Sequence, residues 1–229
     1  NKTRSNWHEV ATSGNVDAIV IGTWPYLHCE ATCAALNCGK HVLCEARMAM
    51  NFSESQQMLK TSREHSNLTS QLVPAPFTLH SDKTIRSYID EDRLGKILYF
   101  HADYQTMTMQ NDNSTLHWRR NKKYSGENTM VLGIIYESIQ RWIPPAKKLS
   151  ATGNIFNDKS IDPETENIIS IEIPDYLLIQ MEMENNIRGS FLISEVGLHS
   201  PTPAITIYGT KGSLKVEFIQ NKKQLKIVR

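Results

Sequence analysis

The sequence predicts an α/β fold with a parallel sheet, followed by an α+β domain with a large, mostly antiparallel open sheet. Residues 16–73 alternate between strand patterns and helix patterns, which is typical of a parallel sheet covered by helices. From residue 148 onward, strand patterns follow one another through tight turns, which indicates an antiparallel sheet with helices on one face. Pro74-Ala75-Pro76 forms a stiff border between the two patterns. We therefore expect two domains, residues 1–75 and 76–229.

The first domain contains a strand, a turn, a helix and a second strand. The nearly uninterrupted apolar run at residues 16–22 predicts one strand that is buried on both faces. Pro25 has no backbone N–H, so it ends this strand and precedes a helix over 26–37. Gly39 is expected to cap that helix in the left-handed conformation, and residues 41–44 form the next strand.

Two turns follow the carboxyl ends of these strands, at residues 23–28 and 45–47. In a strand–helix–strand unit, ligands bind in the crevice outside the carboxyl ends of the strands. The sequence therefore predicts that a bound molecule contacts these two turns.

The remaining elements follow from periodicity and from turn residues. The polar stretch 105–128 has little periodicity and is expected to loop over a site. Ser53 is the expected N-cap of the helix over 53–66. Helices are expected over 53–66, 82–92 and 130–142, and strands over 68–73, 96–104, 149–155, 167–173, 176–184, 188–195, 204–209, 213–218 and 224–228.

The composition argues against several classes of partner. A formal net charge of +1 over 229 residues gives no electrostatic reason to expect nucleic acid or a membrane surface. No apolar run approaches the roughly 18–20 residues that cross a bilayer. No secretory signal opens the chain, so its cysteines are expected to be reduced thiols in the cytoplasm. The cysteines and histidines lack paired CxxC spacing, so we expect no metal.

One block and its surroundings carry a family resemblance. The GKHVLCE block at residues 39–45 is preceded by VDAIVI at 16–21 and by Pro25-x-x-His28. The likeness continues in later segments, namely LGKI at 94–97, the pair Trp118-Arg119 and IYGTKGSL at 207–214. With these motifs, almost the whole chain resembles the glucose–fructose oxidoreductase/inositol dehydrogenase/MocA family.

This resemblance implies an N-terminal Rossmann domain that binds NAD or NADP, followed by an α+β domain. Members of the family oxidise or reduce sugars, cyclitols and related polyols, so a sugar-like or polyol substrate is expected. The family's first strand, glycine-rich turn and helix have no counterpart before residue 16. The resemblance therefore implies an incomplete Rossmann-like sheet, in a chain cut from a longer protein.

The same resemblance assigns cofactor contacts, with residues 23–25 lining the dinucleotide. His28 would lie near the cofactor ribose or support the fold, and capping of the helix start is the structural alternative. Arg47 would bind an anionic substrate group or a cofactor phosphate, or it would be a solvated turn residue. Trp118 and Arg119 would reach the nicotinamide end of the site, or anchor a surface loop. The expected cofactor-binding residues are Thr23, Trp24, Pro25, His28, Glu45, Ala46, Arg47, Trp118 and Arg119.

Four positions depart from the family pattern. The family has a lysine and a proline where Ala46 and Arg47 stand, and an aspartate and a histidine where Val131 and Ile135 stand. Oxidation of an alcohol needs a titratable base within hydrogen-bond reach, so we expect Tyr136 and Glu137 to be the catalytic residues. In the alternative, the tyrosine packs against the sheet and the glutamate pairs with the arginine four residues later.

Two functions follow from these observations. The first is an NAD(P)-dependent oxidoreductase of this family that acts by hydride transfer on a sugar-like or polyol substrate. The alternative is a catalytically inactive family member that serves as a binding or scaffold protein. In either case the open sheet face needs covering, so we expect a homo-oligomer through strands within residues 176–218.

Overall fold

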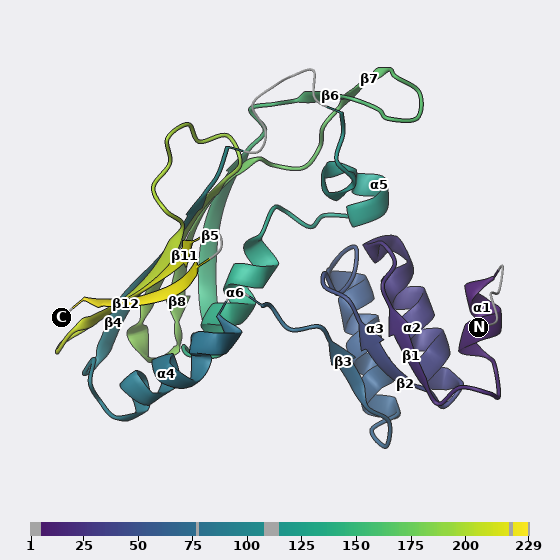
Figure 1. Ribbon diagram of the computed structural model, residues 1–229, viewed down its shortest axis with the longest axis horizontal. Helices are drawn as coiled ribbons and strands as arrows, with labels where there is room; N and C mark the ends of the chain where they lie inside the picture. The colour runs from purple at the N-terminus through teal and green to yellow at the C-terminus, as the bar shows by residue number, and fades with distance from the viewer. Residues whose placement is uncertain (1–5, 77, 108–114, 220–221, 229) are drawn as a thin grey trace. The chain divides into compact units, whose positions relative to one another are not determined.

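The chain forms two compact units. The computed structural model describes residues 6–76, 78–107, 115–219 and 222–228 (Figure 1). The first boundary between the two units follows Pro74, within the proline-rich segment that the sequence predicts as the border. The segment 117–128, which is expected in the second domain, belongs to the first unit. Unit 1 comprises Asn1–Pro74 and His117–Asn128, and unit 2 comprises Ala75–Leu116 and Thr129–Arg229.

Unit 1 is built on a three-stranded parallel sheet in the order β1-β2-β3. Ile19 of β1 lies opposite Val42 of β2, and Leu43 of β2 lies opposite Gln71 of β3. This sheet matches the predicted parallel arrangement. The elements of the unit are α1 (Trp7–Ala11), β1 (Ala18–Ile21), the 3-10 helix η1 (Pro25–Leu27), α2 (His28–Asn37), β2 (His41–Cys44), α3 (Phe52–Glu64), β3 (Ser70–Leu72), the 3-10 helix η2 (Trp118–Arg120) and α5 (Lys122–Ser125).

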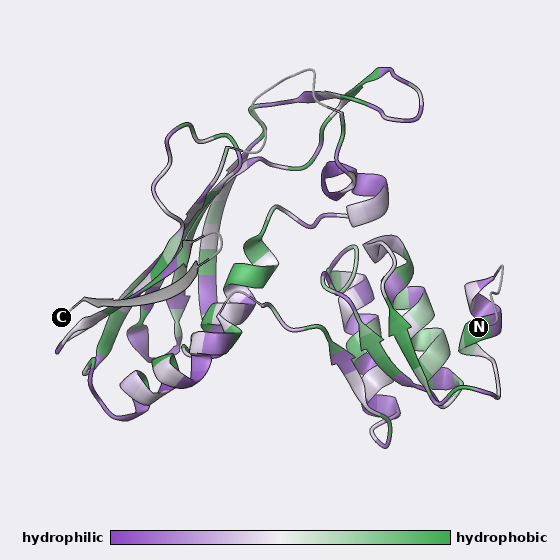
Figure 2. Cartoon of the chain, in the orientation of Figure 1, coloured by the Kyte–Doolittle hydropathy of each residue, from purple (hydrophilic) through white to green (hydrophobic). Residues whose placement is uncertain are grey.

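Helices α2 and α3 pack on one face of this sheet. Ile21 and Val42 from the apolar strands, drawn in green in Figure 2, belong to one buried cluster. Leu36 of α2 and Met58 of α3 belong to the same cluster. Successive strand residues point to opposite faces, and Val20 is 72% exposed. The prediction of a strand buried on both faces is therefore wrong within unit 1, because both helices lie on the same face.

Local sequence explains the helix ends in unit 1. Gly39 has a φ of +74° and follows Cys38, the C-cap of α2, which confirms the predicted left-handed residue at this helix end. Helix α3 begins at Phe52 because Asn51, rather than Ser53, is its N-cap. The side-chain oxygen of Asn51 accepts a hydrogen bond from the backbone N–H of Glu54 at 3.0 Å.

Unit 2 is built on a seven-stranded sheet in the order β12-β11-β10-β4-β9-β8-β5. Strands β4 and β9 pair parallel, and the other neighbouring pairs are antiparallel. The predicted fold class is therefore confirmed. The elements of the unit are α4 (Leu79–Asp90), β4 (Ile97–Gln105), α6 (Leu132–Gln140), β5 (Ala146–Asn154), β6 (Lys159–Ile161), β7 (Ile168–Ser170), β8 (Tyr176–Met183), the 3-10 helix η3 (Glu184–Asn186), β9 (Arg188–Ser194), β10 (Ala204–Gly209), β11 (Ser213–Ile219) and β12 (Lys222–Val228).

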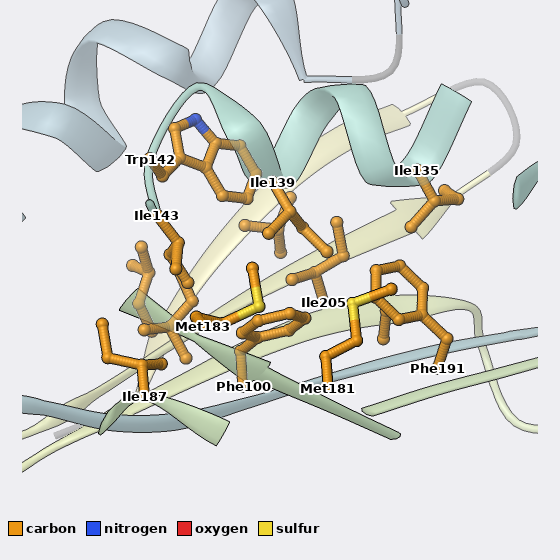
Figure 3. Close-up of a cluster of buried hydrophobic side chains, with 14 of the residues drawn as sticks. Phe100, Ile135, Ile139, Trp142, Ile143, Met181, Met183, Ile187, Phe191 and Ile205 are labelled. Carbon is orange, nitrogen blue, oxygen red and sulfur yellow. The ribbon is translucent and has the colours of Figure 1, made fainter. Parts of the chain in front are cut away.

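The main core of unit 2 lies between helix α6 and one face of the large sheet (Figure 3). Ile135 and Ile139 of α6 are fully buried against Phe100, Met181 and Phe191 of the sheet. The two phenyl rings meet edge to face, with centroids 5.7 Å apart. Truncating one of these isoleucines to alanine is expected to cost about 2–5 kcal/mol.

Two parts of the chain differ from the predicted elements. The sequence does not predict β6, because a three-residue strand is too short to display alternation. The stretch expected to be a loop contains helical turns at η2 and α5, and its residues 108–114 lie outside the described residues. Across the ranges given above, no helix is both long and apolar enough to cross a membrane.

Candidate functional site

His28 links the two turns that follow β1 and β2. Its side chain is fully buried. Its Nε2 lies 2.9 Å from the carbonyl oxygen of Thr23, and its Nδ1 lies 2.7 Å from the carbonyl oxygen of Arg47. Because a carbonyl oxygen only accepts, a ring nitrogen that carries a proton is the donor in such a contact. The predicted adjacency of the two turns is therefore confirmed, and His28 holds them together.

The segment 117–128 packs on the second of these turns. The Arg47 guanidinium donates from Nη1 to the Ser125 hydroxyl at 3.0 Å. Gly126 has a φ of +65°, and a Cβ at this position would lie only 2.5 Å from the Cα of Met50. A residue with a side chain is therefore excluded there on two counts, conformation and space. Glycine at 126 thus lets the segment lie against the turn.

Four aromatic rings gather where the first turn meets this segment. The ring of Trp24 lies 6.0 Å from that of Trp118 and 4.5 Å from that of Tyr124. Tyr26 adds a fourth ring, 6.0 Å from Tyr124. Trp24 is 42% exposed and Tyr26 is 44% exposed. Large aromatic faces therefore remain open to a ligand at this place.

Basic side chains border these rings. The Arg119 guanidinium lies 4.3 Å above the ring of Trp118. The pKa of His117 is lowered, first by desolvation and then by the positive charges of Arg119 and Arg47. We call this group the aromatic–cationic cluster, and its members are Trp24, Tyr26, Arg47, His117, Trp118, Arg119 and Tyr124.

The other residues expected at the cofactor lie in the same two turns. Pro25 is buried at the first position of η1, and the Thr23 hydroxyl donates to the next carbonyl oxygen at 3.3 Å. Glu45 and Ala46 are exposed, and the Glu45 amide donates to the carbonyl oxygen of Ile21 at 2.9 Å. All nine expected cofactor residues therefore belong to unit 1.

The two expected catalytic residues belong to α6 in unit 2. The Glu137 carboxylate pairs with Arg141 at 2.6 Å and accepts from the backbone N–H of Ala75 at 3.0 Å. Tyr136 packs against the core, with its ring 6.2 Å from that of Phe191. These are the structural contacts that the alternative interpretation expects. The catalytic role of both residues stays a prediction.

Two of the positions that differ from the family pattern, Val131 and Ile135, pack in the apolar core of unit 2. Ile135 is fully buried in the core of unit 2, and Val131 precedes α6 and packs on the same core. Neither side chain can take up a proton.

The cysteines behave as buried small side chains rather than as reactive groups. All four are free thiols, and only Cys38 is exposed. Burial raises the pKa of Cys29 to about 12 and that of Cys44 to about 11, which disfavours the reactive thiolate. Among the described residues, no three His, Cys, Asp or Glu side chains are grouped as metal ligands would be.

Sequence reasoning did not identify His117, Tyr26 or Tyr124 as members of the cluster. A signal was present, because aromatic residues at 118 and 124 flank a run of basic residues. That pattern has no helical or strand period, so it does not reveal which element the segment packs against.

Two family models match the chain. Residues 83–215 match the model described as the GFO/IDH/MocA C-terminal domain. Residues 2–72 match the model described as an oxidoreductase family with an NAD-binding Rossmann fold.

Curated relatives and solved structures agree with these matches. The chain is 24% identical over 221 residues to 2,7-anhydro-N-acetylneuraminate hydratase of Mediterraneibacter gnavus, covering 93% of this chain and 54% of that protein. It is 27% identical over 126 residues to levoglucosan dehydrogenase of Pseudarthrobacter phenanthrenivorans, covering 55% of this chain and 32% of that protein. A solved levoglucosan dehydrogenase in complex with NADH and L-sorbose superposes with a TM-score of 0.84 at 19% identity, over 98% of this chain and 64% of that one. The chain thus spans about half the length of the first of these relatives.

Proposed function

Because the chain belongs to the GFO/IDH/MocA oxidoreductase family, we propose that the whole protein is an NAD(P)-dependent oxidoreductase acting on a sugar-like or polyol substrate. The observation that carries this proposal is the His28 link. It brings the turns after β1 and β2 together at the carboxyl ends of parallel strands, where dinucleotides bind in such sheets. Relatives named as sugar dehydrogenases and a neighbour solved with NADH and a sugar support it.

The residues of the cluster suit the nicotinamide part of a dinucleotide. Exposed faces of Trp24 and Tyr26 offer stacking surface for a planar ring, and Arg119 offers a cation for phosphate oxygens. The turn at 23–25 would line the cofactor, and the turn at 45–47 would border the reacting ring. When bound, the nicotinamide would supply or accept the hydride.

A proton must also move when an alcohol is oxidised. We propose Tyr136 for this step in preference to Glu137, because the glutamate is already engaged by Arg141 and by a backbone N–H. Tyr136→Phe would then abolish turnover while cofactor binding stays unchanged. Turnover that survives Tyr136→Phe would reject this assignment.

A second candidate function is a catalytically inactive binding or scaffold protein. The fully buried Ile135 favours it, because the family's histidine at this position is replaced by a side chain without a proton to exchange. The two candidates differ in one measurable respect. Turnover of NAD(P)H with any sugar or polyol excludes the scaffold, and cofactor binding without turnover across such a panel favours it.

The test of the main proposal is a titration of the full-length protein with NADH and NADPH, followed by the cofactor's own fluorescence. We expect saturable binding of at least one of the two. Trp24→Leu should weaken it about tenfold, in line with the loss of one stacked ring. Trp7→Leu is the matched control, since Trp7 belongs to unit 1 but not to the cluster. A fluorescence signal that neither cofactor changes would contradict the proposal.

We also propose a homo-oligomer in the cytoplasm. A groove of about 770 Å³ crosses β4, β5, β8 and β9 on the large sheet. Tyr99 lines it, is 45% exposed and stacks on the ring of Tyr208, so a second copy that covers these rings would bury apolar surface. Free thiols suit a reducing compartment. A solution mass equal to one chain would reject the oligomer.

A further inference from the structure

One residue of the proline border has both of its backbone groups held by side chains. Pro74 and Pro76 have no backbone N–H, so Ala75 carries the only amide donor among these three residues. Its N–H donates to both carboxylate oxygens of Glu137, at 3.0 and 3.1 Å, and its carbonyl oxygen accepts from Nη2 of Arg141 at 2.9 Å. Ala75 is only 1% exposed, so leaving these groups unpaired would be costly.

The two side chains that hold Ala75 are themselves fixed within unit 2. Glu137 lies in α6 and Arg141 is the C-cap of that helix, and Nη2 of the arginine donates to Oε1 of the glutamate at 2.6 Å. Nη1 of the arginine donates to Asp82 of α4 at 2.7 Å, and the other oxygen of this carboxylate accepts from the Trp142 indole at 2.8 Å. The guanidinium is therefore held from two sides. We call Glu137 and Arg141 the linker clamp.

The chain on the other side of Pro74 is held within unit 1. The Val73 N–H donates to the carbonyl oxygen of Cys44 at 2.8 Å. Cys44 is the last residue of β2 and directly precedes the turn at 45–47. A single proline, whose ring fixes its φ, therefore separates a backbone hydrogen bond of unit 1 from the clamp of unit 2. Few torsions remain free to change at this crossing.

This short connection joins two places that the proposed reaction uses. On one side, Cys44 leads into a turn expected at the cofactor. On the other side, Glu137 follows Tyr136, the residue proposed to move the proton, on α6. A reaction between groups on different parts of a chain needs them held accurately, because a misplacement of about 1 Å costs on the order of a hundredfold in rate. Both carboxylate oxygens of Glu137 already accept hydrogen bonds, which suits holding the chain rather than taking up a proton.

We propose that the linker clamp fixes the direction in which the chain leaves unit 2, and that Glu137 is thereby a positioning residue for turnover rather than its base. The proposal rests on the proposed function, from which the reaction and the part of Tyr136 are taken. It deepens that function by assigning the role of Glu137, which acts through the backbone of Ala75.

The first test compares Glu137→Ala with Glu137→Gln in the full-length protein, by steady-state kinetics with NAD+ and NADP+ on a panel of sugars and polyols that includes glucose and myo-inositol. Glu137→Ala should lower kcat by roughly ten- to a hundredfold, the size of effect that misplaced reacting groups produce. The glutamine keeps a carbonyl oxygen for the Ala75 N–H, so Glu137→Gln should lose less and keep the shape of the kcat–pH profile. A base would behave differently, because both variants would then be equally inactive and the profile would lose one limb.

Two further measurements accompany the kinetics. The NADH dissociation constant should stay within about twofold in Glu137→Ala, because the expected cofactor contacts lie in unit 1. Glu64→Ala is the matched control and should leave kcat unchanged. Glu64 pairs with Lys60 at the same spacing of four residues, on the exposed surface of α3.

The state of the clamp is read at the Ala75 amide, independently of turnover. Hydrogen–deuterium exchange at this amide should become at least about tenfold faster in Glu137→Ala, while the amides of α6 and β9 keep their protection. A general loss of stability would instead speed exchange in all three places. This pattern separates a local release of the linker from unfolding of unit 2.

A second variant guards against loss of folding, because it leaves the clamp bonds in place. Pro74→Gly frees the φ angle at the exposed residue between the two anchors. It should lower kcat in the same direction as Glu137→Ala, with unchanged exchange at Ala75. Pro163→Gly is the control, since Pro163 is an exposed proline in the turn between β6 and β7.

The outcomes separate this inference from the proposed function. Full turnover in both Glu137→Ala and Pro74→Gly, unchanged Ala75 exchange in Glu137→Ala, or a lost pH limb in Glu137→Gln would overturn the positioning role and leave the oxidoreductase in place. An unsubstituted protein that turns over no member of the panel would overturn both.

Discussion

His117 is the residue whose protonation reports most directly on the aromatic–cationic cluster. Its pKa is lowered by desolvation, by Arg119 and by Arg47, in that order. Arg119→Met and Arg47→Met should each raise this pKa toward the usual value of 6.5, with the larger effect from Arg119→Met. Titration of the imidazole by NMR measures it directly. Arg63→Met is the control and should leave the His117 pKa unchanged.

The lowered pKa of His117 also sets the sign of a stability effect. The folded protein binds a proton at His117 less readily than the unfolded chain does. Acidification below about pH 6.5 should therefore reduce the free energy of unfolding, and stability should recover as pH rises. Arg119→Met should reduce this acid sensitivity. An unfolding free energy with the same pH dependence in both proteins would contradict the assigned cause.

Single residues mark the limit of what sequence reasoning predicts here. Trp24 and Trp118 are expected as lining from the resemblance, and the structure brings their rings together. His117 carries no motif, so its place beside Arg47 depends on how the segment 117–128 packs. Glu137 is predicted as catalytic from its chemistry, with pairing to Arg141 as the alternative, whereas the hydrogen bond that it accepts from the backbone N–H of Ala75 becomes visible only in the fold.

At the scale of elements, His28 is expected to hold the turns after β1 and β2 against each other. His28→Leu keeps an apolar body but removes the two ring nitrogens that lie against the carbonyl oxygens of Thr23 and Arg47. The expected cost is about 2 kcal/mol in the free energy of unfolding, measured by chemical denaturation. His65→Leu is the control, because His65 makes its hydrogen bond to Asn37 at the surface. Equal losses in the two variants would remove His28 from its linking role.

The start of unit 2 is tied to both of its helices through Arg141. This side chain is 21% exposed and contacts Asp82 of α4 at 2.7 Å, Glu137 of α6 at 2.6 Å and the Ala75 carbonyl oxygen at 2.9 Å. Arg141→Met should cost about 2 kcal/mol, between the values typical of exposed and buried pairs.

Arg93→Met provides the matched comparison for that network. Arg93 pairs with Glu91 at the surface, where solvent screens the charges, so its removal should change the unfolding free energy little. Urea denaturation of both variants measures the difference. An Arg141→Met protein as stable as Arg93→Met would show that the network does not hold α4 and α6 together.

Helices and strands are predictable from the sequence where their hydrophobic periodicity extends over enough residues. The strand at 41–44 is reproduced at His41–Cys44, and helix α2 ends at Asn37, the predicted last residue, with Gly39 following in the left-handed conformation. The helical turns at η2 and α5 escape such reasoning, because three or four residues show no period. Their position is decided by tertiary contacts, such as the bond between Arg47 and Ser125.

At the scale of the whole molecule, two sheets of different type explain the division of the chain. Parallel strands need helical crossovers, so β1, β2 and β3 alternate with α2 and α3 in unit 1. Antiparallel strands can follow one another through short turns, as β8 and β9 do in unit 2. Both patterns are readable from the sequence. The return of residues 117–128 to unit 1 is not, because a polar segment gives no sign of the surface on which it packs.

The central claim is that the two turns joined by His28, together with the cluster, form the surface that binds a nicotinamide dinucleotide. Hydrogen–deuterium exchange of the full-length protein, with and without NADH, tests it most directly. The account predicts slower exchange on NADH binding in peptides covering residues 23–28, 45–50 and 117–125. Protection confined to other segments, with unchanged exchange in these three, would contradict it.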